Sequence, residues 1–184
     1  SEVEKLLREA KESSREVKDR SKKSIDELRE STKTVERLIR DLNRKLKEIL
    51  DRVADDMRRR DKELAERIIR EVLKRVDDVH RESKKIADEN KELLKRVNDR
   101  DREIVKRNDE LLDEVLKRIR ELPVDEKIVR RVEEIVRRLK KESKDLVEES
   151  TRVADELRRR TDRLVEEDER SVRKIKEDLD RLRK

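Results

Sequence analysis

The fold is decided within the stretch SSREVKDRSKKSIDELREST, residues 13–32. Its apolar residues, among them Val17 and Leu28, keep the three- and four-residue spacing of one helix face. Four serines fall on the same face, where a helix that packs on a core normally carries Leu or Val. They are Ser14, Ser21, Ser24 and Ser31. The chain therefore places hydroxyl groups toward its own core, and other segments have to supply hydrogen-bond partners for them.

Composition restricts the chain to helices. Of its 184 residues, 59% are charged and 30% are apolar, and Gly, Cys and aromatic residues are absent. Without Gly, tight hairpin turns lose their preferred residue, and without aromatic residues strands lose many of their favoured side chains. So polar a chain could be disordered, but its apolar residues are phased rather than scattered. The sequence therefore predicts an all-α fold.

Charge and targeting signals argue against several functions. Lys and Arg number 57 against 51 acidic residues, giving a net charge of +6, but the two signs alternate at helical spacing. Because there is neither a basic stripe nor an aromatic stacking platform, we predict no nucleic-acid binding. No apolar run approaches the ~20 residues of a membrane span and no signal peptide is present, so no membrane association is predicted. We expect a soluble recombinant product expressed in the cytoplasm, with Ser1 in place of an initial Met.

The first third of the chain reads as one uninterrupted helix. From Val3 to Met57, apolar and hydroxyl positions follow steps of three and four without a slip to a period of two. Ser1 and Glu4 have the spacing of a capping box. Similar lines run from Val72 to Leu122 and from Ile128 to Leu182. The mean period is close to 3.6, so we expect helices that are nearly straight or weakly supercoiled.

The clearest break between helices lies in ELPVDEK, residues 121–127. Pro123 disfavours helix at the residue before it, and Asp125 can cap the start of the next helix. Val124 and Val129 have the spacing of a hydrophobic staple across that start. These signals predict a turn.

A second turn is expected near residue 60, because one helix running as far as Leu122 would be implausibly long. RRRDKELAE, residues 58–66, is the best candidate, with Asp61 as the N-cap. The local sequence does not dictate a turn by itself. RVADDMRRR at 52–60 nearly recurs as RVADELRRR at 152–160, where a continuous helix is predicted.

Turns near 60 and 123 divide the chain into three segments of nearly equal length. Each helix of ~60 residues would be ~90 Å long at 1.5 Å per residue. We therefore predict an antiparallel, up-down-up three-helix bundle with helices at about 2–59, 62–121 and 126–183. The whole chain, 1–184, is expected to form a single elongated helical-bundle domain.

The stripe serines find polar partners when residues at equal height in the bundle are paired. Between the first two helices the predicted pairs are Ser14–Asn108, Ser21–Asp101, Ser24–Asn98 and Ser31–Asn90, with Ser13, Thr32 and Thr34 as substitutes. Between the last two they are Ser150–Asn98, Ser143–Asp101 and Thr161–Ser83, and Asn43, His80 and Asp168 share one further layer. A buried polar group left unpaired costs about 1–3 kcal/mol, so shared layers predict hydrogen-bond networks that fix helix register. The alternative is that these side chains are solvated.

The single histidine, His80, raises the question of metal or catalytic chemistry. One imidazole without a second imidazole or a thiolate is a poor metal site, even with Asp77 nearby. Ser83, His80 and Asp168 supply the residue types of a hydrolase triad, but nothing provides an oxyanion hole or a substrate pocket. We predict no enzymatic activity, no metal and no cofactor.

Taken together, the absence of Gly and aromatic residues, the polar layers between aliphatic layers, and a turn such as LPVDEK form one style of sequence. In this style the chain resembles computationally designed helical bundles with buried hydrogen-bond networks. The resemblance covers the whole chain. It implies a stable, highly charged scaffold, often built to test core specificity or to present a face to a partner.

The sequence leads to two main hypotheses for the function. A natural coiled-coil rod is a third, although natural rods seldom lack Gly and aromatic residues over this length. The first is a self-contained scaffold that requires no partner and has no natural biochemical activity. The second is an interaction module that forms a homo-oligomer or binds a designed helical partner. Apolar residues beside the main lines could fill the flanks of a closed core or leave a groove. They are Leu6, Ile25, Ile39, Leu50, Ile69, Leu94, Val105, Leu112, Val136, Val147 and Val165.

Overall fold

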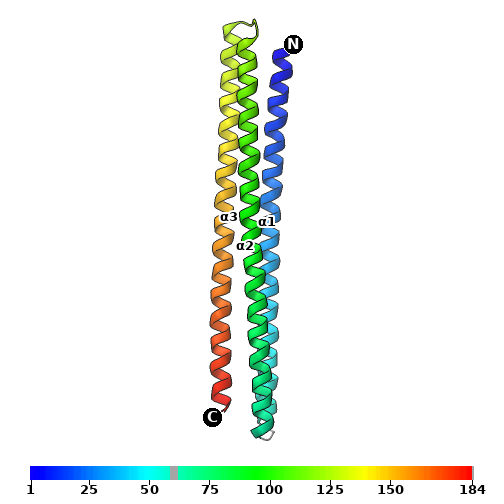
Figure 1. Cartoon of the computed structure of the whole chain (residues 1–184), viewed down its shortest axis with the longest axis vertical. Helices are drawn as coiled ribbons and strands as arrows, with labels where there is room; N and C mark the ends of the chain where they lie inside the picture. The colour runs from blue at the N-terminus through cyan, green and yellow to red at the C-terminus, as the bar shows by residue number, and fades with distance from the viewer. Residues whose placement is uncertain (59–61, 184) are drawn as a thin grey trace. The chain divides into compact units, whose positions relative to one another are not determined.

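Three long α-helices follow one another along the chain (Figure 1). α1 spans Glu2–Met57, α2 spans Lys62–Glu121 and α3 spans Glu126–Arg183. This computed structural model describes residues 1–58 and 62–183, among which there is no strand. The predicted three-helix bundle, with helices of similar length, is confirmed. The predicted N-cap residue Asp61 lies outside the described residues.

The predicted capping residues start two of the helices. Ser1 Oγ accepts a hydrogen bond from the Glu4 backbone N–H at 3.3 Å, and the Glu4 carboxylate lies 3.6 Å from the terminal ammonium group. This is the reciprocal arrangement of a capping box. At the start of α3, Asp125 Oδ1 accepts from the Lys127 backbone N–H at 3.5 Å. α3 therefore begins three residues after Pro123, as the sequence predicts.

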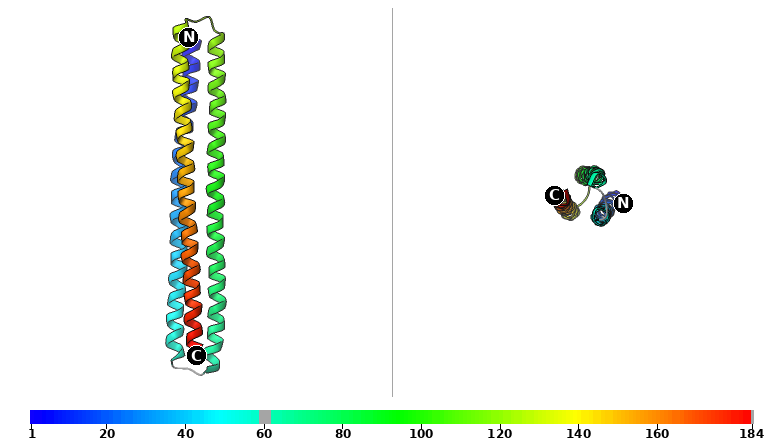
Figure 2. Two further views of the ribbon diagram at one scale, coloured as in Figure 1. Left: turned by 90° about the vertical axis from the view of Figure 1, so that its left-hand side faces the viewer. Right: turned by 90° about the horizontal axis from the view of Figure 1, so that it is seen from below.

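The chain divides into two compact units. Unit 1 contains Ser1–Arg29 and Leu93–Glu156, and unit 2 contains Glu30–Glu92 and Leu157–Lys184. Each unit therefore holds a segment of each of the three helices, which can be followed by colour in Figure 2. That the whole chain forms a single domain stays a prediction.

Each unit has its own aliphatic core. The cluster of unit 1 comprises Leu6, Ala10, Leu112, Val115, Ile119, Val132, Val136 and Leu139. The clusters of unit 2 comprise Leu46, Val53, Ile69, Val72, Val76, Val172, Ile175 and Leu179, and then Val35, Ile39, Ala87 and Leu164. In unit 1, the first residues of α1 meet the last residues of α2 and the first of α3, so α2 runs antiparallel to α1 and α3. Removal of these side chains from water, at about 25 cal/mol per Å² of apolar surface, drives the helices together.

The core contains residues from the predicted lines, such as Leu28, Val76 and Leu179, together with most of the apolar residues predicted beside them. Residues expected at the flanks are buried at the centre, and only Leu50, Val147 and Val165 of that set are half-buried. Conversely, four residues expected on the lines are at least 40% exposed: Leu38, Leu111, Ile128 and Leu182. Three of them stand directly before another apolar residue, as in Leu38–Ile39 and Leu111–Leu112. Where two apolar residues are adjacent, periodicity alone cannot decide which one faces the core.

The outer faces carry ion pairs along single helices, as the alternating charges predict. Arg20–Glu16, Arg70–Glu66 and Arg107–Glu103 are each four residues apart, with N–O distances of 3.8, 3.9 and 3.5 Å. Such exposed pairs contribute little to stability individually. Over the described residues, no helix is long and apolar enough to cross a membrane.

Candidate functional site

Unit 1 contains one buried asparagine that bonds to both other helices. Asn108 of α2 is 3% exposed. Its Oδ1 accepts a hydrogen bond from Ser13 Oγ at 2.7 Å, and its Nδ2 donates to Ser14 Oγ at 3.3 Å and to Ser143 Oγ at 3.2 Å. The amide thus uses its oxygen and its nitrogen inside the core. We call Asn108 with Ser13, Ser14 and Ser143 hub 1.

Unit 2 contains the same arrangement around Asn90. Its Oδ1 accepts from Ser31 Oγ at 2.9 Å, and its Nδ2 donates to Thr32 Oγ1 at 3.2 Å and to Thr161 Oγ1 at 3.3 Å. The Thr161 hydroxyl donates in turn to the Leu157 carbonyl oxygen at 2.9 Å. We call Asn90 with Ser31, Thr32 and Thr161 hub 2.

The two hubs repeat with a spacing of five helical turns. On α1 and α3, the hub 2 residues follow those of hub 1 by about 18 residues, and on α2 the hub 2 asparagine precedes that of hub 1 by the same interval. Five turns return a side chain to the same helix face. Core neighbours repeat with the hubs, since Val17 matches Val35, Leu112 matches Leu94 and Leu139 matches Leu157. Both units therefore use one solution for joining three helices.

A buried carboxylate forms a second layer in unit 1. Asp101 of α2 is 4% exposed, and it accepts hydrogen bonds from Ser150 Oγ, at 2.8 Å, and from Ser24. Burial raises the pKa of Asp101 above its usual value, and the two serine hydrogen bonds offset part of that rise. One turn away, Thr151 Oγ1 donates to Asn98 Oδ1 at 3.1 Å. Like hub 1, this layer connects all three helices.

The corresponding layer in unit 2 contains the histidine. His80 Nδ1 lies 2.7 Å from Asp168 Oδ2, with the His80 side chain 25% exposed and the Asp168 side chain buried. Asp168 Oδ1 and Ser83 Oγ are both buried, and neither has a hydrogen-bond partner among the described residues. The His80 imidazole therefore contacts one oxygen of the buried Asp168 carboxylate.

Ion pairs connect the helices outside these layers. In unit 2, Arg160 Nε and Nη2 donate to the two carboxylate oxygens of Glu36, both at 3.1 Å, and this bidentate pair bridges α1 and α3 beside hub 2. Between α2 and α3, the pairs are Arg120–Glu133 and Lys140–Asp113 in unit 1, and Lys91–Asp162 and Lys176–Asp77 in unit 2. α3 is therefore tied at its flanks to α2 in both units.

A further titratable group lies beside the α2–α3 pairs of unit 1. Burial raises the pKa of Asp109, Lys140 lowers it and the neighbouring Asp113 raises it. Asp109 Oδ1 is buried and has no hydrogen-bond partner in the part of the chain that the structure describes. This carboxylate is less well satisfied than Asp101.

The register between α2 and α3 differs from the predicted one. Ser150 bonds Asp101 and not Asn98, Ser143 bonds Asn108 and not Asp101, and Thr161 bonds Asn90 and not Ser83. Each partner lies one or two turns closer to the C-terminus of α2 than predicted. Helical side chains lean toward the N-terminus of their own helix, so side chains that meet across an antiparallel pair belong to Cα atoms at different heights. Pairing by equal height ignores this lean. Because polar residues recur within two turns on α2, the prediction therefore selects the neighbouring polar layer instead of the correct one.

Between α1 and α2, the structure brings together Ser14 with Asn108 and Ser31 with Asn90, as predicted. Ser24 bonds Asp101 and not Asn98. Ser21, predicted to bond Asp101, is buried, but its Oγ has no partner among the described residues. Ser21 and Ser24 are one turn apart, and Ser24 occupies the position beside the carboxylate.

Asn43 does not join the pair of His80 and Asp168 through a hydrogen bond. Its Oδ1 is buried without a partner in the described part of the chain, although the residue as a whole is half-buried. Equal height placed Asn43 in this layer, but height does not determine which side of a helix a residue faces. The predicted triad is therefore a pair.

Several connecting residues are absent from the predicted pairs. Ser13 and Thr32 appear in the sequence analysis only as substitutes, yet each bonds a hub asparagine. The sequence feature that could have identified Ser13 and Thr32 is that each stands next to another hydroxyl residue. Two adjacent hydroxyls can bond to the oxygen and the nitrogen of the same amide. No signal identifies Glu36 and Arg160, since every helix is rich in both charges.

The polar side chains of the hubs and of the layers beside them form hydrogen bonds that connect the helices. Among the residues described, no group of three or more His, Cys, Asp or Glu side chains is placed to hold a metal ion. The hub amides and hydroxyls are uncharged and bond to one another inside the core. Each such bond requires one helix to lie at a particular height against another.

The fold and these layers define the protein as an antiparallel three-helix bundle with buried hydrogen-bond networks. Comparison of the sequence with protein-family models and with curated proteins finds no match. Among solved structures, the chain is similar to a "Computationally designed three helix bundle", with a TM-score of 0.77 and 17% sequence identity. The match covers 99% of this chain and 90% of that one. The resemblance to designed helical bundles therefore holds for the fold.

Proposed function

We propose that the protein is a designed structural scaffold with no natural biochemical activity, whose buried polar layers specify helix register and pairing. The observation that carries this proposal is the pair of hubs, one in each unit, in which one asparagine bonds both other helices. Similarity to a computationally designed three-helix bundle supports a designed origin. The polar groups then act on the fold itself rather than on a substrate.

A displacement of one turn shows how a hub selects register. Moving α1 by one turn would place Ala10 or Val17 opposite Asn108 and carry Ser14 away from it. Each buried polar group left without a partner costs about 1–3 kcal/mol. A hub contains four polar side chains, so the penalty is a large part of a typical folding free energy of about 5–15 kcal/mol.

A displacement of five turns requires a second argument, because it would superpose one hub on the other. The layers beside the hubs differ in which helix carries the carboxylate. In unit 1, Asp101 of α2 faces Ser150 of α3, whereas the equivalent residues in unit 2 are Ser83 of α2 and Asp168 of α3. Moving α3 by five turns would place Asp168 at the position of Ser150, and two buried carboxylates would then meet. The arrangement therefore penalises the one displacement that the hubs tolerate.

The proposal is tested by removing both hubs at once. The variant combines Asn108→Leu, Ser13→Ala, Ser14→Ala and Ser143→Ala in hub 1 with Asn90→Leu, Ser31→Ala, Thr32→Val and Thr161→Val in hub 2. We expect it to remain helical and at least as stable, because replacing a whole buried polar network by apolar residues is often neutral or stabilising. It should nevertheless lose its single register, seen as multiple or broadened backbone amide resonances and as mixed masses in light scattering.

A matched control removes buried hydroxyls that bond nothing among the described residues. Ser21→Ala with Ser83→Ala should leave one sharp set of amide resonances. The proposal is wrong if the variant without hubs keeps a single sharp spectrum and the mass of one folded species. It is also wrong if the control broadens the spectrum as much as the loss of both hubs.

A further inference from the structure

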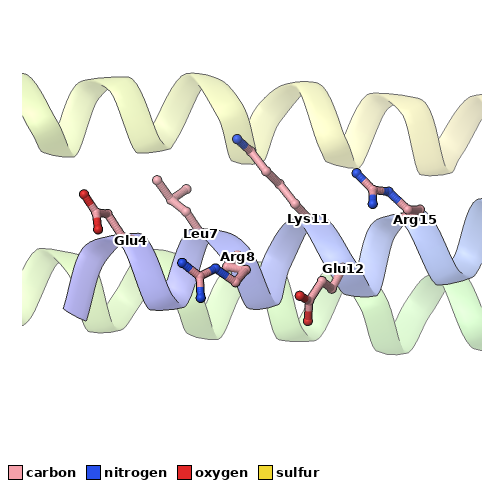
Figure 3. Close-up of a pocket in the computed structure, with 6 residues that line it drawn as sticks. All are labelled: Glu4, Leu7, Arg8, Lys11, Glu12 and Arg15. Carbon is pink, nitrogen blue, oxygen red and sulfur yellow. The ribbon is translucent and has the colours of Figure 1, made fainter. Parts of the chain in front are cut away.

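The surface of unit 1 is hollowed between α1 and α3. One groove of about 260 Å³ is lined by both helices, with Ser14 and Lys18 on α1 and Leu139, Glu142, Ser143 and Leu146 among its residues on α3. A second hollow of about 370 Å³ follows along α1, and the residues that line it, from Glu4 to Arg15, all belong to α1. Figure 3 shows Leu7 and Lys11 extending from α1 toward α3 in this second hollow. Together the two cover about four helical turns of α1.

The repeat of the hubs supplies an internal comparison for this groove. Five turns further along α1 and α3, the positions of Lys18 and Glu142 are occupied by Glu36 and Arg160. There the guanidinium binds both carboxylate oxygens and bridges the two helices. In unit 1 the charges are reversed, and no ion pair within the described residues joins Lys18 to Glu142. A lysine ammonium lacks the planar fork of arginine, so the same position stays open.

The two edges of the groove carry opposite charge. The α1 edge presents Lys11, Arg15 and Lys18, and the α3 edge presents Glu142, Asp145 and Glu149, all of them exposed. Two acidic residues of α1, Glu4 and Glu12, also line the second hollow, so the basic charge of this edge is concentrated at its three Lys and Arg positions. In the described part of the chain, none of the six side chains presented by the two edges takes part in an ion pair. By contrast, the α2–α3 side of the same unit is closed by Arg120–Glu133 and Lys140–Asp113. The α1–α3 side therefore offers two unpaired rows of charge.

The floor of the groove combines aliphatic side chains with hydroxyls. Leu7 and Leu146 are half-buried, so part of their apolar surface is still open to solvent. Ser14 and Ser143 also line the groove, and both accept hydrogen bonds from Asn108. Ser143 is buried, whereas Ser14 is half-buried and still has a hydroxyl hydrogen to donate. A ligand that fits this groove is therefore apolar along most of its length and carries one polar group at the height of hub 1.

We propose that this groove binds an amphipathic α-helix of a partner protein, as the fourth helix of unit 1. The face of that helix carries Leu or Ile, with one Ser, Asn or Gln that meets Ser14. Acidic residues line its edge beside α1, and Lys or Arg residues line its edge beside α3. The row charges fix which way the helix is rotated, because the reverse placement brings like charges together. This interaction goes beyond the role of the hubs in the fold and does not depend on it.

The probe is a fluorescein-labelled helical peptide of about three heptads, with Leu and Ile at the a and d positions and one central Ser. Glu occupies the edge intended for α1 and Lys the edge intended for α3. We expect fluorescence anisotropy to report saturable binding to the full chain, with a dissociation constant on the order of 10 µM for so small an interface. A peptide with Glu and Lys exchanged is expected to bind at least tenfold more weakly.

The matched variants exploit the internal repeat. Lys18→Glu with Glu142→Arg installs in unit 1 the side chains that bridge α1 and α3 in unit 2, and should weaken peptide binding at least tenfold without changing the net charge. Glu36→Lys with Arg160→Glu makes the opposite exchange in unit 2 and should leave binding unchanged. Circular dichroism of both variants confirms that they remain helical.

Three results would overturn the inference. One is the absence of peptide binding at millimolar concentration, and another is equal binding of the charge-exchanged peptide or of the closed Lys18→Glu, Glu142→Arg variant. The third is a mass of two chains by sedimentation that falls to one in that same variant, since a second copy would then be the occupant. Failure here leaves the register experiment on the hubs unaffected, so the two proposals are tested separately.

Discussion

Each hub relies on what one planar amide can do. Asn108 accepts a hydrogen bond through its oxygen and donates two through its nitrogen, and a single serine could not reach both other helices in this way. An amide is also uncharged, so its burial costs less than that of a carboxylate. Asparagine therefore joins three helices at a smaller penalty than Asp101, whose pKa burial raises.

Replacing the hub residue alone should be more harmful than replacing its whole network. Asn108→Leu is expected to lower the free energy of unfolding by about 1–3 kcal/mol, because the buried Ser143 hydroxyl loses its partner. Adding Ser13→Ala, Ser14→Ala and Ser143→Ala should recover most of that loss. Urea denaturation of the three proteins measures both steps, with Ser83→Ala as the control for a hydroxyl without a described partner. Full stability in the single variant would contradict the hub.

Asp101→Asn should make the protein more stable at neutral pH. Burial disfavours the charged form of Asp101, and the folded-state pKa is therefore raised. The folded state then holds this proton more tightly than the unfolded chain, so the wild type gains stability as pH falls through the raised pKa toward about 3.9. We expect the variant to be about 1 kcal/mol more stable at pH 7, where the carboxylate is charged.

The advantage of Asp101→Asn should shrink as the pH is lowered toward about 4. Urea denaturation of variant and wild type at each pH isolates this group, because the other carboxylates are common to both proteins. A difference that does not change with pH, or one that grows in acid, would show that burial of Asp101 does not control this part of the stability.

At the residue scale, sequence reasoning identifies two of the four predicted partners of the α1 serines. Ser14 and Asn108 are matched by height alone, and so are Ser31 and Asn90. It fails for Ser150 and Ser143, because polar residues recur on α2 within two turns and the lean of the side chains decides between them. Height is a property of the backbone, whereas a hydrogen bond also depends on side-chain direction.

At the scale of the helix, the two turns are encoded differently. Pro123 and Asp125 determine where α3 begins, as the cap from Asp125 to the Lys127 backbone shows. The end of α1 has no such signal. RVADDMRRR contains the last helical residue of α1, Met57, whereas the nearly identical RVADELRRR lies inside α3, with Leu157 fully buried. These nine residues therefore do not by themselves decide where α1 ends.

The cap at Asp125 should have a measurable but local effect. Asp125→Ala removes the side-chain acceptor for the Lys127 N–H and is expected to cost about 1 kcal/mol in the free energy of unfolding. Asp125→Ser retains an acceptor and should lose less than half of that. Thermal denaturation followed by circular dichroism compares the three proteins, and equal losses for Ala and Ser would show that the cap does not act through this hydrogen bond.

At the scale of the molecule, each unit contains its own hub and its own aliphatic core. Composition and periodicity are sufficient to predict three antiparallel helices, because no other element fits a chain without Gly and aromatic residues. They are not sufficient to predict the division into units, which depends on which side chains contact one another. Leu111 and Leu112 illustrate the limit, since only the contacts of the folded chain bury the second and expose the first.

Hydrogen exchange should distinguish the units. Asn90→Leu is expected to lower amide protection in Glu30–Glu92 and Leu157–Lys184 while leaving the other unit close to wild type, because exchange follows local opening. Asn108→Leu should give the reciprocal pattern. Exchange measured by mass spectrometry on peptic fragments resolves these segments, and a uniform loss of protection in both variants would mean that the chain opens only as a whole.

The five-turn interval between the hubs gives the sequence a natural unit of growth. A cassette of about 18 residues added to every helix returns each face to its starting direction, so a third asparagine with its hydroxyl partners could be written in phase with the first two. An insertion of any length that is not close to a whole number of turns would instead rotate the hydroxyls out of the interior. Length in this architecture is therefore adjustable in discrete steps, and the asparagines mark the step size.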